Sequence, residues 1–312
     1  MSIPAPRLAT PLPSFLPEAP AGWQFLLARA EAADRAGIDR VNVSDHVVFG
    51  ERLDRYGDPK VGGTIGGKQP TGPDGQWLDP ITVLTMIAAR TTRVRLGTAI
   101  LLAALRRPIT LQKTLSTLDV LSGGRVDLGV GVGWQREEYD AAGLAFEERG
   151  RLLDHTLAVM QAVWRNEAAA FGDDYLSFEH IHSMPKPVQD GGVPIWVSGT
   201  ANAAVARRIA RFGSGWIPWG PAAADLVTGV PEMRDLVAAA GGSLDGMAIV
   251  GNLRSVRRDD GRVDYAATME QVPELAAVGV TDFTLAFSVR DEAAVFDMYA
   301  EAVAAFRLAA GR

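Results

Sequence analysis

The sequence contains no cysteine and few histidines, and it lacks runs of basic residues and apolar runs of membrane-spanning length. Without cysteine, the 312-residue chain has no disulfides, thiolate nucleophiles or cysteine-ligated metals. The net charge is −6 and no cluster of Lys and Arg stands out, which argues against a nucleic-acid partner. No apolar stretch reaches the roughly 18–20 residues of a membrane span, and residues 1–20 lack the basic and apolar regions of a secretion signal. We therefore expect a cytoplasmic protein without a membrane partner.

Residues 94–143 contain the most informative pattern. An apolar run over 94–102 is followed by a break at Arg106-Arg107-Pro108. A stretch with the apolar period of a helix comes next, and Gly123-Gly124 ends it. A second apolar run begins at Val126 and leads into Gly131-Val132-Gly133-Trp134. Near-continuous apolar strands on either side of a helix are typical of a parallel sheet buried on both faces. The segment therefore predicts a strand–helix–strand unit.

A helix, a glycine and a β-branched run recur together along the chain, as at Gly37, Gly213 and Gly279. Glycine can adopt the left-handed conformation that closes a helix and turns the chain back. We predict strands near 8–12, 38–44, 94–101, 126–132, 194–198, 215–219, 247–253 and 281–287. We predict helices near 22–36, 79–91, 108–121, 148–165, 201–212, 221–240, 264–278 and 291–308. This alternation predicts an α/β fold, a (β/α)8 TIM barrel forming one domain over residues 1–312; a doubly wound open sheet is the alternative.

Two stretches are too long to be simple connections. Residues 47–78 follow the second predicted strand, and the loops after barrel strands lie on the active face. This stretch is therefore a candidate active-site loop, with a disordered insertion as the alternative. Residues 166–193 follow the fourth predicted helix and form a second insertion, in which 175–182 could belong to a hairpin.

Three segments at predicted strand ends could carry chemistry. In Ser44-Asp45-His46, the imidazole can take or give a proton near neutral pH, and a neighbouring carboxylate can orient it. The glycines of Gly131-Val132-Gly133 let backbone approach a ligand closely. Ser198-Gly199-Thr200 leads into a helix N-terminus that could bind an anion. The alternatives are a structural histidine, a common strand-end glycine pattern, and an ordinary helix cap by Thr200 or Asn202.

The other histidines make weaker cases for a site. His180 and His182 would share one face of a strand, but no third ligand accompanies them, so a surface role is favoured over a metal site. His155 lies on the apolar face of a predicted helix, which indicates a structural role. We predict no metal site.

The chain resembles the bacterial luciferase-like family of flavin and deazaflavin enzymes, particularly its branch of coenzyme F420-dependent oxidoreductases. The resemblance lies in residues 33–46 (ADRAGIDRVNVSDH), 79–98 (DPITVLTMIAARTTRVRLGT), 101–108, 123–143, 146–164, 185–189 and 193–216. It runs from about residue 8 to the end of the chain and weakens after residue 220. It implies a barrel with an insertion after the fourth helix.

The resemblance also implies a cofactor whose ring lies in the barrel mouth, coenzyme F420 with FMN as the alternative. Asp45 and His46 match the family's aspartate and histidine, so we expect both to be catalytic and Asp45 also to contact the cofactor. Ala99-Ile100 falls where deazaflavin members have a non-proline cis peptide that backs the ring. The other implied cofactor-binding residues are Leu102, Val132, Gly133 and Glu137 around the ring, and Gly199, Thr200 and Ala204 near the tail phosphate.

Two departures from the family's sugar-phosphate dehydrogenases concern the substrate. Those enzymes carry a glutamate at the position of Trp134 in this chain. They also carry threonine and lysine residues that bind phosphate, at positions where this chain has Ile217-Pro218-Trp219-Gly220. With Trp134, Trp219, Trp77 and Phe49, the mouth would be aromatic. A hydrophobic or planar small-molecule substrate therefore fits better than a sugar phosphate.

We expect an oxidoreductase that moves a hydride between coenzyme F420 and a small hydrophobic substrate. The alternatives are a monooxygenase that uses reduced FMN and oxygen, a non-catalytic flavin-binding protein, and an unrelated barrel lyase. A lyase would need a lysine at a strand end, and all four lysines lie outside the predicted strands.

The resemblance also implies a homodimer formed through early helices. The predicted helix over 79–91 has an apolar stripe suited to that contact, made of Val83, Leu84, Ile87 and Ala88. Ordinary packing of this stripe against the barrel is the alternative.

Overall fold

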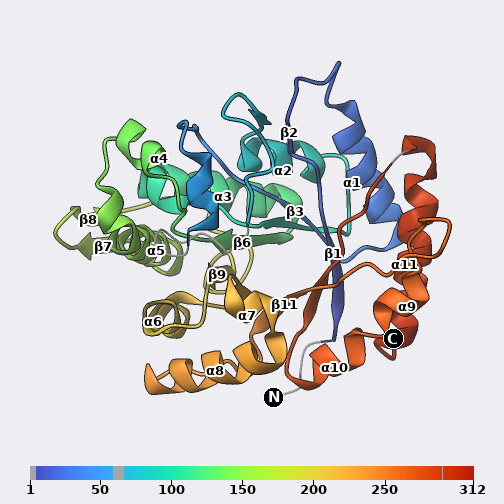
Figure 1. Ribbon diagram of the computed structural model, residues 1–312. Helices are drawn as coiled ribbons and strands as arrows, with labels where there is room; N and C mark the ends of the chain where they lie inside the picture. The colour runs from blue at the N-terminus through green and yellow to red at the C-terminus, as the bar shows by residue number, and fades with distance from the viewer. Residues whose placement is uncertain (1–4, 59–66, 290) are drawn as a thin grey trace.

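The computed structural model describes residues 5–58, 67–289 and 291–312, and within these residues parallel strands close into a barrel with helices around it (Figure 1). The barrel strands are β1 (Arg7–Pro11), β3 (Arg40–Val43), β5 (Arg95–Thr98), β6 (Val126–Val130), β9 (Ile195–Gly199), β10 (Gly215–Pro218), β11 (Ala248–Asn252) and β12 (Asp282–Thr284). They pair in the order β1-β12-β11-β10-β9-β6-β5-β3, and every neighbouring pair is parallel. Each lies where the sequence predicts a strand, which confirms the (β/α)8 barrel over an open sheet.

The helices follow the strands in the predicted alternation. They are α1 (Gln24–Ala36), α2 (Pro80–Ala88), α3 (Pro108–Ser122), α4 (Arg136–Ala141), α5 (Arg149–Arg165), α6 (Ala203–Phe212), α7 (Pro221–Ala224), α8 (Leu226–Ala239), α9 (Tyr265–Met269), α10 (Val272–Ala277) and α11 (Val295–Ala309). The predicted helix over 221–240 divides at Asp225, whose carboxylate accepts the Thr228 N–H and caps α8. The predicted helix over 264–278 divides before α10, where Pro273 occupies the first turn.

Two small antiparallel sheets stand apart from the barrel. Strands β7 (Ala169–Gly172) and β8 (Ser177–Ile181) form the hairpin expected within residues 166–193. His155 of α5 bonds Asp173 at the turn of this hairpin, with 2.5 Å between Nδ1 and Oδ2, which fits its expected structural role. Strands β2 (Phe15–Leu16) and β4 (Gln76–Trp77) pair at the end of the 47–78 loop. Within that loop Leu53–Gly57 is a 3-10 helix, whereas 59–66 lie outside the described residues.

The apolar stripe of α2 is buried within the chain itself. Val83 is 5% exposed, Leu84 1% and Ile87 0%. They belong to the hydrophobic core, and Ala88 packs against it. The stripe is therefore unavailable to a second subunit, and the expected use of these residues in a dimer is wrong. The homodimer itself stays a prediction that needs another surface.

Charged side chains fill the N-terminal end of the barrel interior. Arg40, 1% exposed, places Nη1 2.9 Å from Asp282 Oδ1 and 3.6 Å from Asp127 Oδ2. Its guanidinium also lies 3.9 Å from the centre of the Trp196 ring. Ionised groups are rarely buried unless they are paired, so these residues stabilise one another there.

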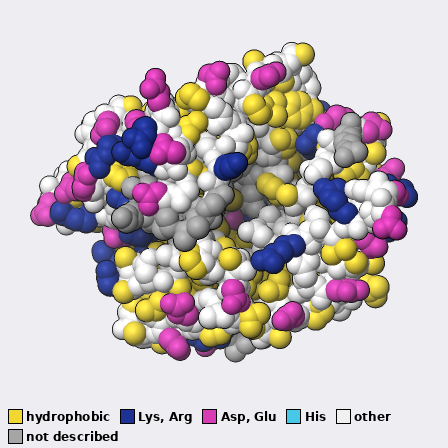
Figure 2. Space-filling view, in the orientation of Figure 1, with side chains coloured by type: hydrophobic (Ala, Val, Ile, Leu, Met, Phe, Trp, Pro, Cys, Tyr) yellow, Lys and Arg dark blue, Asp and Glu magenta, His cyan; other side chains and the backbone are white. Residues whose placement is uncertain are grey.

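Over the face seen in Figure 2, acidic and basic side chains are interspersed. None of the helices in the described ranges is both long enough and apolar enough to span a membrane.

Candidate active site

Residues that follow the barrel strands meet at one end of the barrel, because the carboxyl ends of its parallel strands point the same way. Three such segments adjoin one another: Ser44-Asp45-His46 after β3, 99–102 after β5, and 131–138 after β6. The Ala99 N–H donates to the Val43 carbonyl at 2.8 Å, and Ser44 Oγ donates to the Ala99 carbonyl at 3.2 Å. The bridge between Leu101 and Val130 extends the pairing of β5 with β6 beyond the strands.

His46 is held by Glu138, a residue of α4. The distance between His46 Nδ1 and Glu138 Oε1 is 3.1 Å, and the same oxygen accepts the Val47 N–H at 2.8 Å. The Glu138 side chain is fully buried and that of His46 is 10% exposed. Because a carboxylate can only accept, the proton resides on Nδ1 and the Nε2 lone pair is left for another group. Nothing in the described part of the chain bonds Nε2.

Asp45 has a different partner from the one expected. Its carboxylate forms a two-pronged ion pair with Arg106, at 2.6 Å for Oδ2–Nη1 and 3.0 Å for Oδ1–Nη2, and Oδ2 accepts the Leu102 N–H at 2.9 Å. Arg106 also binds Asp79 at 3.0 Å. The carboxylate that contacts His46 is therefore Glu138 and not the adjacent Asp45, whose catalytic and cofactor-binding roles stay predictions. Asp45 instead fixes the backbone at Leu102.

The ion pairs of this network shift the pKa values of Arg106 and Asp79 toward their charged forms. Burial by itself would lower the pKa of Arg106, but the ion pairs with Asp45 and Asp79 outweigh burial and raise it. Burial opposes ionisation of Asp79, yet the Thr82 N–H and Arg106 lower the pKa of that carboxyl. Arg106 and Asp79 therefore stay charged at neutral pH, and the network ties together the ends of β3 and β5 and the start of α2.

An aromatic wall surrounds His46, and it contains all four predicted substrate-pocket residues. Ring-centre distances from His46 are 4.6 Å to Phe49, 4.7 Å to Trp77 and 6.0 Å to Trp134. The wall continues through Tyr56, whose ring centre lies 5.5 Å from that of Trp134 and 6.1 Å from that of Trp219. Burial raises the pKa of Tyr56, so its hydroxyl remains protonated and can donate a hydrogen bond.

The predicted wall behind the cofactor ring is close-packed. The Ala99–Ile100 peptide bond is cis, as the resemblance implies. A Cβ on Gly131 would lie 2.8 Å from the Ile100 side chain, and one on Gly133 would lie 2.8 Å from that of Leu102. Gly133 also has φ +71, a conformation that favours glycine. The backbone conformation therefore favours glycine at 133, whereas a side chain at 131 would require the end of the Ile100 side chain to shift.

Two other cofactor candidates on this turn make contacts within the chain. The Val132 carbonyl accepts the Tyr139 hydroxyl at 2.7 Å. Glu137 packs on the loop at Gly50, where an added Cβ would lie 2.4 Å from the glutamate side chain. Glu137 therefore supports the loop backbone, and its contact with the cofactor stays a prediction.

The N-terminus of α6 is partly occupied by its own cap. The Asn202 side-chain oxygen accepts the N–H groups of Ala204 at 3.0 Å and Val205 at 2.9 Å. The Ala204 N–H is therefore already used, so a phosphate could reach it only by displacing this cap. Gly199 and Thr200 are half-buried just before the cap, and a Cβ on Gly199 would lie 2.5 Å from Val205. Gly199 therefore packs closely against Val205, and phosphate contacts of Gly199 and Thr200 stay predictions.

The residues present suit a flavin or deazaflavin ring in chemical type. Trp134 Nε1, Gln135 Oε1 and Glu138 Oε2 are buried and bond nothing within the described ranges. The Trp134 donor suits one ring carbonyl of such a cofactor, and one of the two acceptors suits its ring N–H. Buried polar atoms without partners are costly, which favours a ligand group there.

Sequence reasoning missed three residues of this site. Glu138 is one of several acidic residues in α4, and the sequence does not show which of them contacts His46. Tyr56 lies in a loop without periodicity, so no pattern singled it out. Arg106 stood in a strand-to-helix break where no pattern assigned it a partner.

Comparison with known proteins identifies the family. The model of the luciferase-like monooxygenase family matches residues 8–272. The chain belongs to the luciferase-like family of oxidoreductases. An uncharacterized Mycobacterium tuberculosis protein is 38% identical over 164 residues, which are 53% of this chain and 57% of the relative. This match thus spans less than two thirds of the relative's length.

Other similar proteins include F420-dependent dehydrogenases and a monooxygenase. The F420-dependent glucose-6-phosphate dehydrogenase of Mycobacterium tuberculosis is 30% identical over 231 residues, 71% of this chain and 61% of that enzyme. An F420-dependent secondary alcohol dehydrogenase has a TM-score of 0.74 at 18% identity, covering 97% and 99% of the two chains. The monooxygenase RslO1 of Streptomyces bottropensis has a TM-score of 0.73 at 22% identity, covering 96% and 98%. Both structures share the fold.

Proposed function

We propose that this chain is a coenzyme F420-dependent oxidoreductase that moves a hydride between the deazaflavin and a small, planar or hydrophobic alcohol or carbonyl compound. The observation that carries this proposal is the imidazole of His46, held by a buried carboxylate inside an aromatic wall. Such a group can move a proton beside an apolar substrate. The resemblance to F420-dependent enzymes supports the choice of cofactor.

The residues of the site divide the chemistry between them. When bound, the cofactor accepts or supplies a hydride at its ring. As an alcohol is oxidised, its carbon gives up the hydride, its hydroxyl proton goes to His46 Nε2, and the carbon–oxygen double bond forms. In the opposite direction, His46 returns the proton to the oxygen. Glu138 keeps the Nδ1 proton in place and stabilises the imidazolium that forms.

The aromatic wall favours a substrate without phosphate. Trp134 and Trp219 occupy the positions at which the family's sugar-phosphate dehydrogenases carry a glutamate and phosphate ligands. Indole and phenol rings bind planar or aliphatic groups and exclude water from the reacting atoms. Tyr56 contacts both tryptophans and can donate its hydroxyl to a substrate oxygen.

Two assays test the proposal. In the first, the protein is mixed with F420 and a panel of hydrophobic secondary alcohols, and with reduced F420 and the matching ketones. We expect a substrate-dependent change in the deazaflavin absorbance without oxygen uptake. In the second, the protein is supplied with reduced FMN and the same compounds. Oxygen uptake with an oxygenated product would instead identify an FMN-dependent monooxygenase. Cofactor binding without turnover in either assay would favour a non-catalytic flavin-binding protein.

A further inference from the structure

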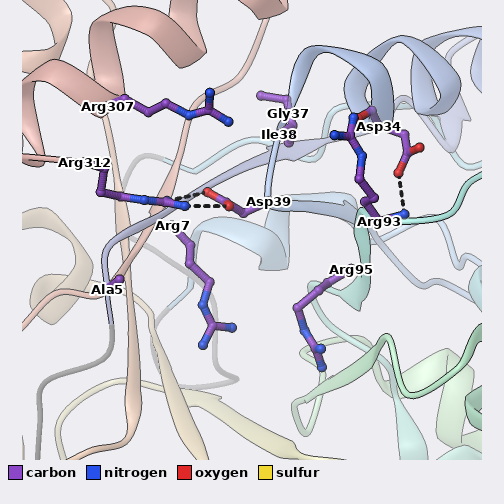
Figure 3. A pocket seen from close by; sticks show the side chains of 10 residues that line it. All are labelled: Ala5, Arg7, Asp34, Gly37, Ile38, Asp39, Arg93, Arg95, Arg307 and Arg312. Carbon is purple, nitrogen blue, oxygen red and sulfur yellow. Dashed lines mark hydrogen bonds and ion pairs between the residues drawn. The ribbon is translucent and has the colours of Figure 1, made fainter.

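A basic cavity lies at the barrel end opposite the candidate active site. It has a volume of about 630 Å³ and is lined at Arg7, Arg93, Arg95, Arg307, Arg312, Asp34, Asp39, Ala5, Gly37 and Ile38 (Figure 3). Arg7 and Arg95 begin β1 and β5, whereas His46 follows the end of β3. The cavity is therefore separate from the aromatic wall. Its volume falls within the roughly 300–1,000 Å³ of small-ligand sites.

Some of the positive charge in this cavity is already matched. Arg312 bonds both oxygens of Asp39, at 3.0 and 3.3 Å. Arg95 pairs with Asp127, which lies outside the lining, at 2.7 Å. The Asp34 carboxylate is held by backbone N–H groups, at 2.8 Å from Arg93 and 2.7 Å from Val94.

Two guanidinium groups lack any such match. Within the described ranges, neither the Arg7 nor the Arg307 side chain forms a hydrogen bond or an ion pair. In the view of Figure 3, the Arg312–Asp39 pair lies between their side chains. The Arg307 group lies against the C-terminal end of α1, because a Cβ on Gly37 would be 2.8 Å from its Nη2. The carbonyl end of a helix favours a cation, which helps to hold Arg307 in the cavity.

The charge balance indicates an anionic ligand. Five arginines and two aspartates line the cavity, an excess of three positive charges, and Asp127 offsets one of them. Two positive charges remain, in a chain whose net charge is −6. Guanidinium groups bind phosphate oxygens through paired, charge-assisted hydrogen bonds.

We propose that this cavity binds a small polyanion that carries at least two phosphate groups, with Arg7 and Arg307 as its principal ligands. Such a ligand links β1 to α11, the first and last elements of the barrel. Because it binds the folded chain at the joint that closes the barrel, it raises the unfolding temperature. It does not contact His46, so this proposal is independent of the proposed function.

The test is titration calorimetry of the purified protein with inorganic pyrophosphate, with orthophosphate for comparison. NaCl keeps the ionic strength constant, because surface charge effects depend on salt. The variants are Arg7→Gln, Arg307→Gln and their combination. Arg207→Gln is the matched control, because Arg207 is exposed on α6 and its substitution removes the same charge outside the cavity. Each variant is also melted with and without pyrophosphate.

We expect saturable binding of pyrophosphate that is tighter than that of orthophosphate. Each single cavity variant should weaken it at least about tenfold, and the double variant should abolish both binding and the rise in unfolding temperature. Without ligand, the double variant should be at least as stable as the wild type, because like charges have been removed. Absence of saturable binding, an equal loss in Arg207→Gln, or full binding by the double variant would overturn the proposal.

Discussion

His46 and Glu138 are 92 positions apart in the chain, and their side chains meet at 3.1 Å between Nδ1 and Oε1. The pairing depends on the parallel order of the barrel, which places the ends of β3, β5 and β6 side by side. It gives the imidazole a fixed tautomer and a fixed orientation. Its consequences for proton transfer can be measured.

Removing the imidazole should slow turnover far more than it weakens cofactor binding. We expect His46→Ala and His46→Gln to lower kcat by about 10²–10⁴-fold, the usual contribution of proton transfer by a side chain. F420 affinity should stay within about tenfold. Wild-type rates in both variants would show that the proton comes from elsewhere.

Glu138 should act through His46 as a positioning residue. Glu138→Gln keeps the shape but can offer an N–H to Nδ1, which favours the wrong tautomer. We expect kcat to fall by about 10–10³-fold, with KM nearly unchanged and a displaced pH–rate profile. Asp140→Asn is the matched control, because this exposed side chain of α4 loses the same charge and should leave the profile unchanged. Identical profiles for both variants would show that Glu138 does not position His46.

Tyr56 should contribute to substrate binding through its ring. Aromatic contacts are worth about 0.5–1.5 kcal/mol each beyond buried area. Tyr56→Ala should therefore raise KM for a planar substrate by about 5–100-fold, with a smaller change in kcat. Tyr56→Phe should retain most of the affinity. Tyr175→Ala, on the exposed β7–β8 hairpin, is the control. Unchanged KM in Tyr56→Ala would place the substrate elsewhere.

The buried charges inside the barrel should be important for stability. Arg40→Met leaves Asp282 without its buried ion-pair partner, whereas Asp127 keeps Arg95, and we expect a loss of about 3–5 kcal/mol in the free energy of unfolding. Arg29→Met, which removes an ion pair to the half-exposed Glu292, should cost less than about 1 kcal/mol. Denaturant unfolding compares the two variants. Equal losses would contradict the assigned role of Arg40.

Stability should fall in acid partly through Asp34. Burial opposes ionisation of this carboxyl, but the N–H groups of Val94, Arg93 and Thr92 outweigh burial and lower its pKa. Its contribution is fully present above the unfolded pKa of about 3.9 and is lost as pH falls through the lower folded value. Asp34→Asn should flatten the dependence of stability on pH below about 4. An unaltered acid profile in this variant would contradict the assignment.

Much of the fold follows from the sequence because strands and helices alternate with clear periods, and glycines such as Gly37 and Gly123 mark the helix ends. The division at Asp225 was not predicted, because one polar cap is a weak signal within an otherwise helical stretch. At the site, the sequence places His46 and the tryptophans at strand ends. It does not show that Glu138 contacts His46, since such a pairing depends on strand order in space.

The choice between F420 and FMN is measured by a paired binding titration. Oxidised F420 and FMN are titrated separately into the protein, with cofactor fluorescence as the readout, and each is then displaced by the other. We expect saturable binding of F420 that is tighter than that of FMN, and displacement of FMN by F420. Tight FMN binding without saturable F420 binding would overturn the proposed F420-dependent function.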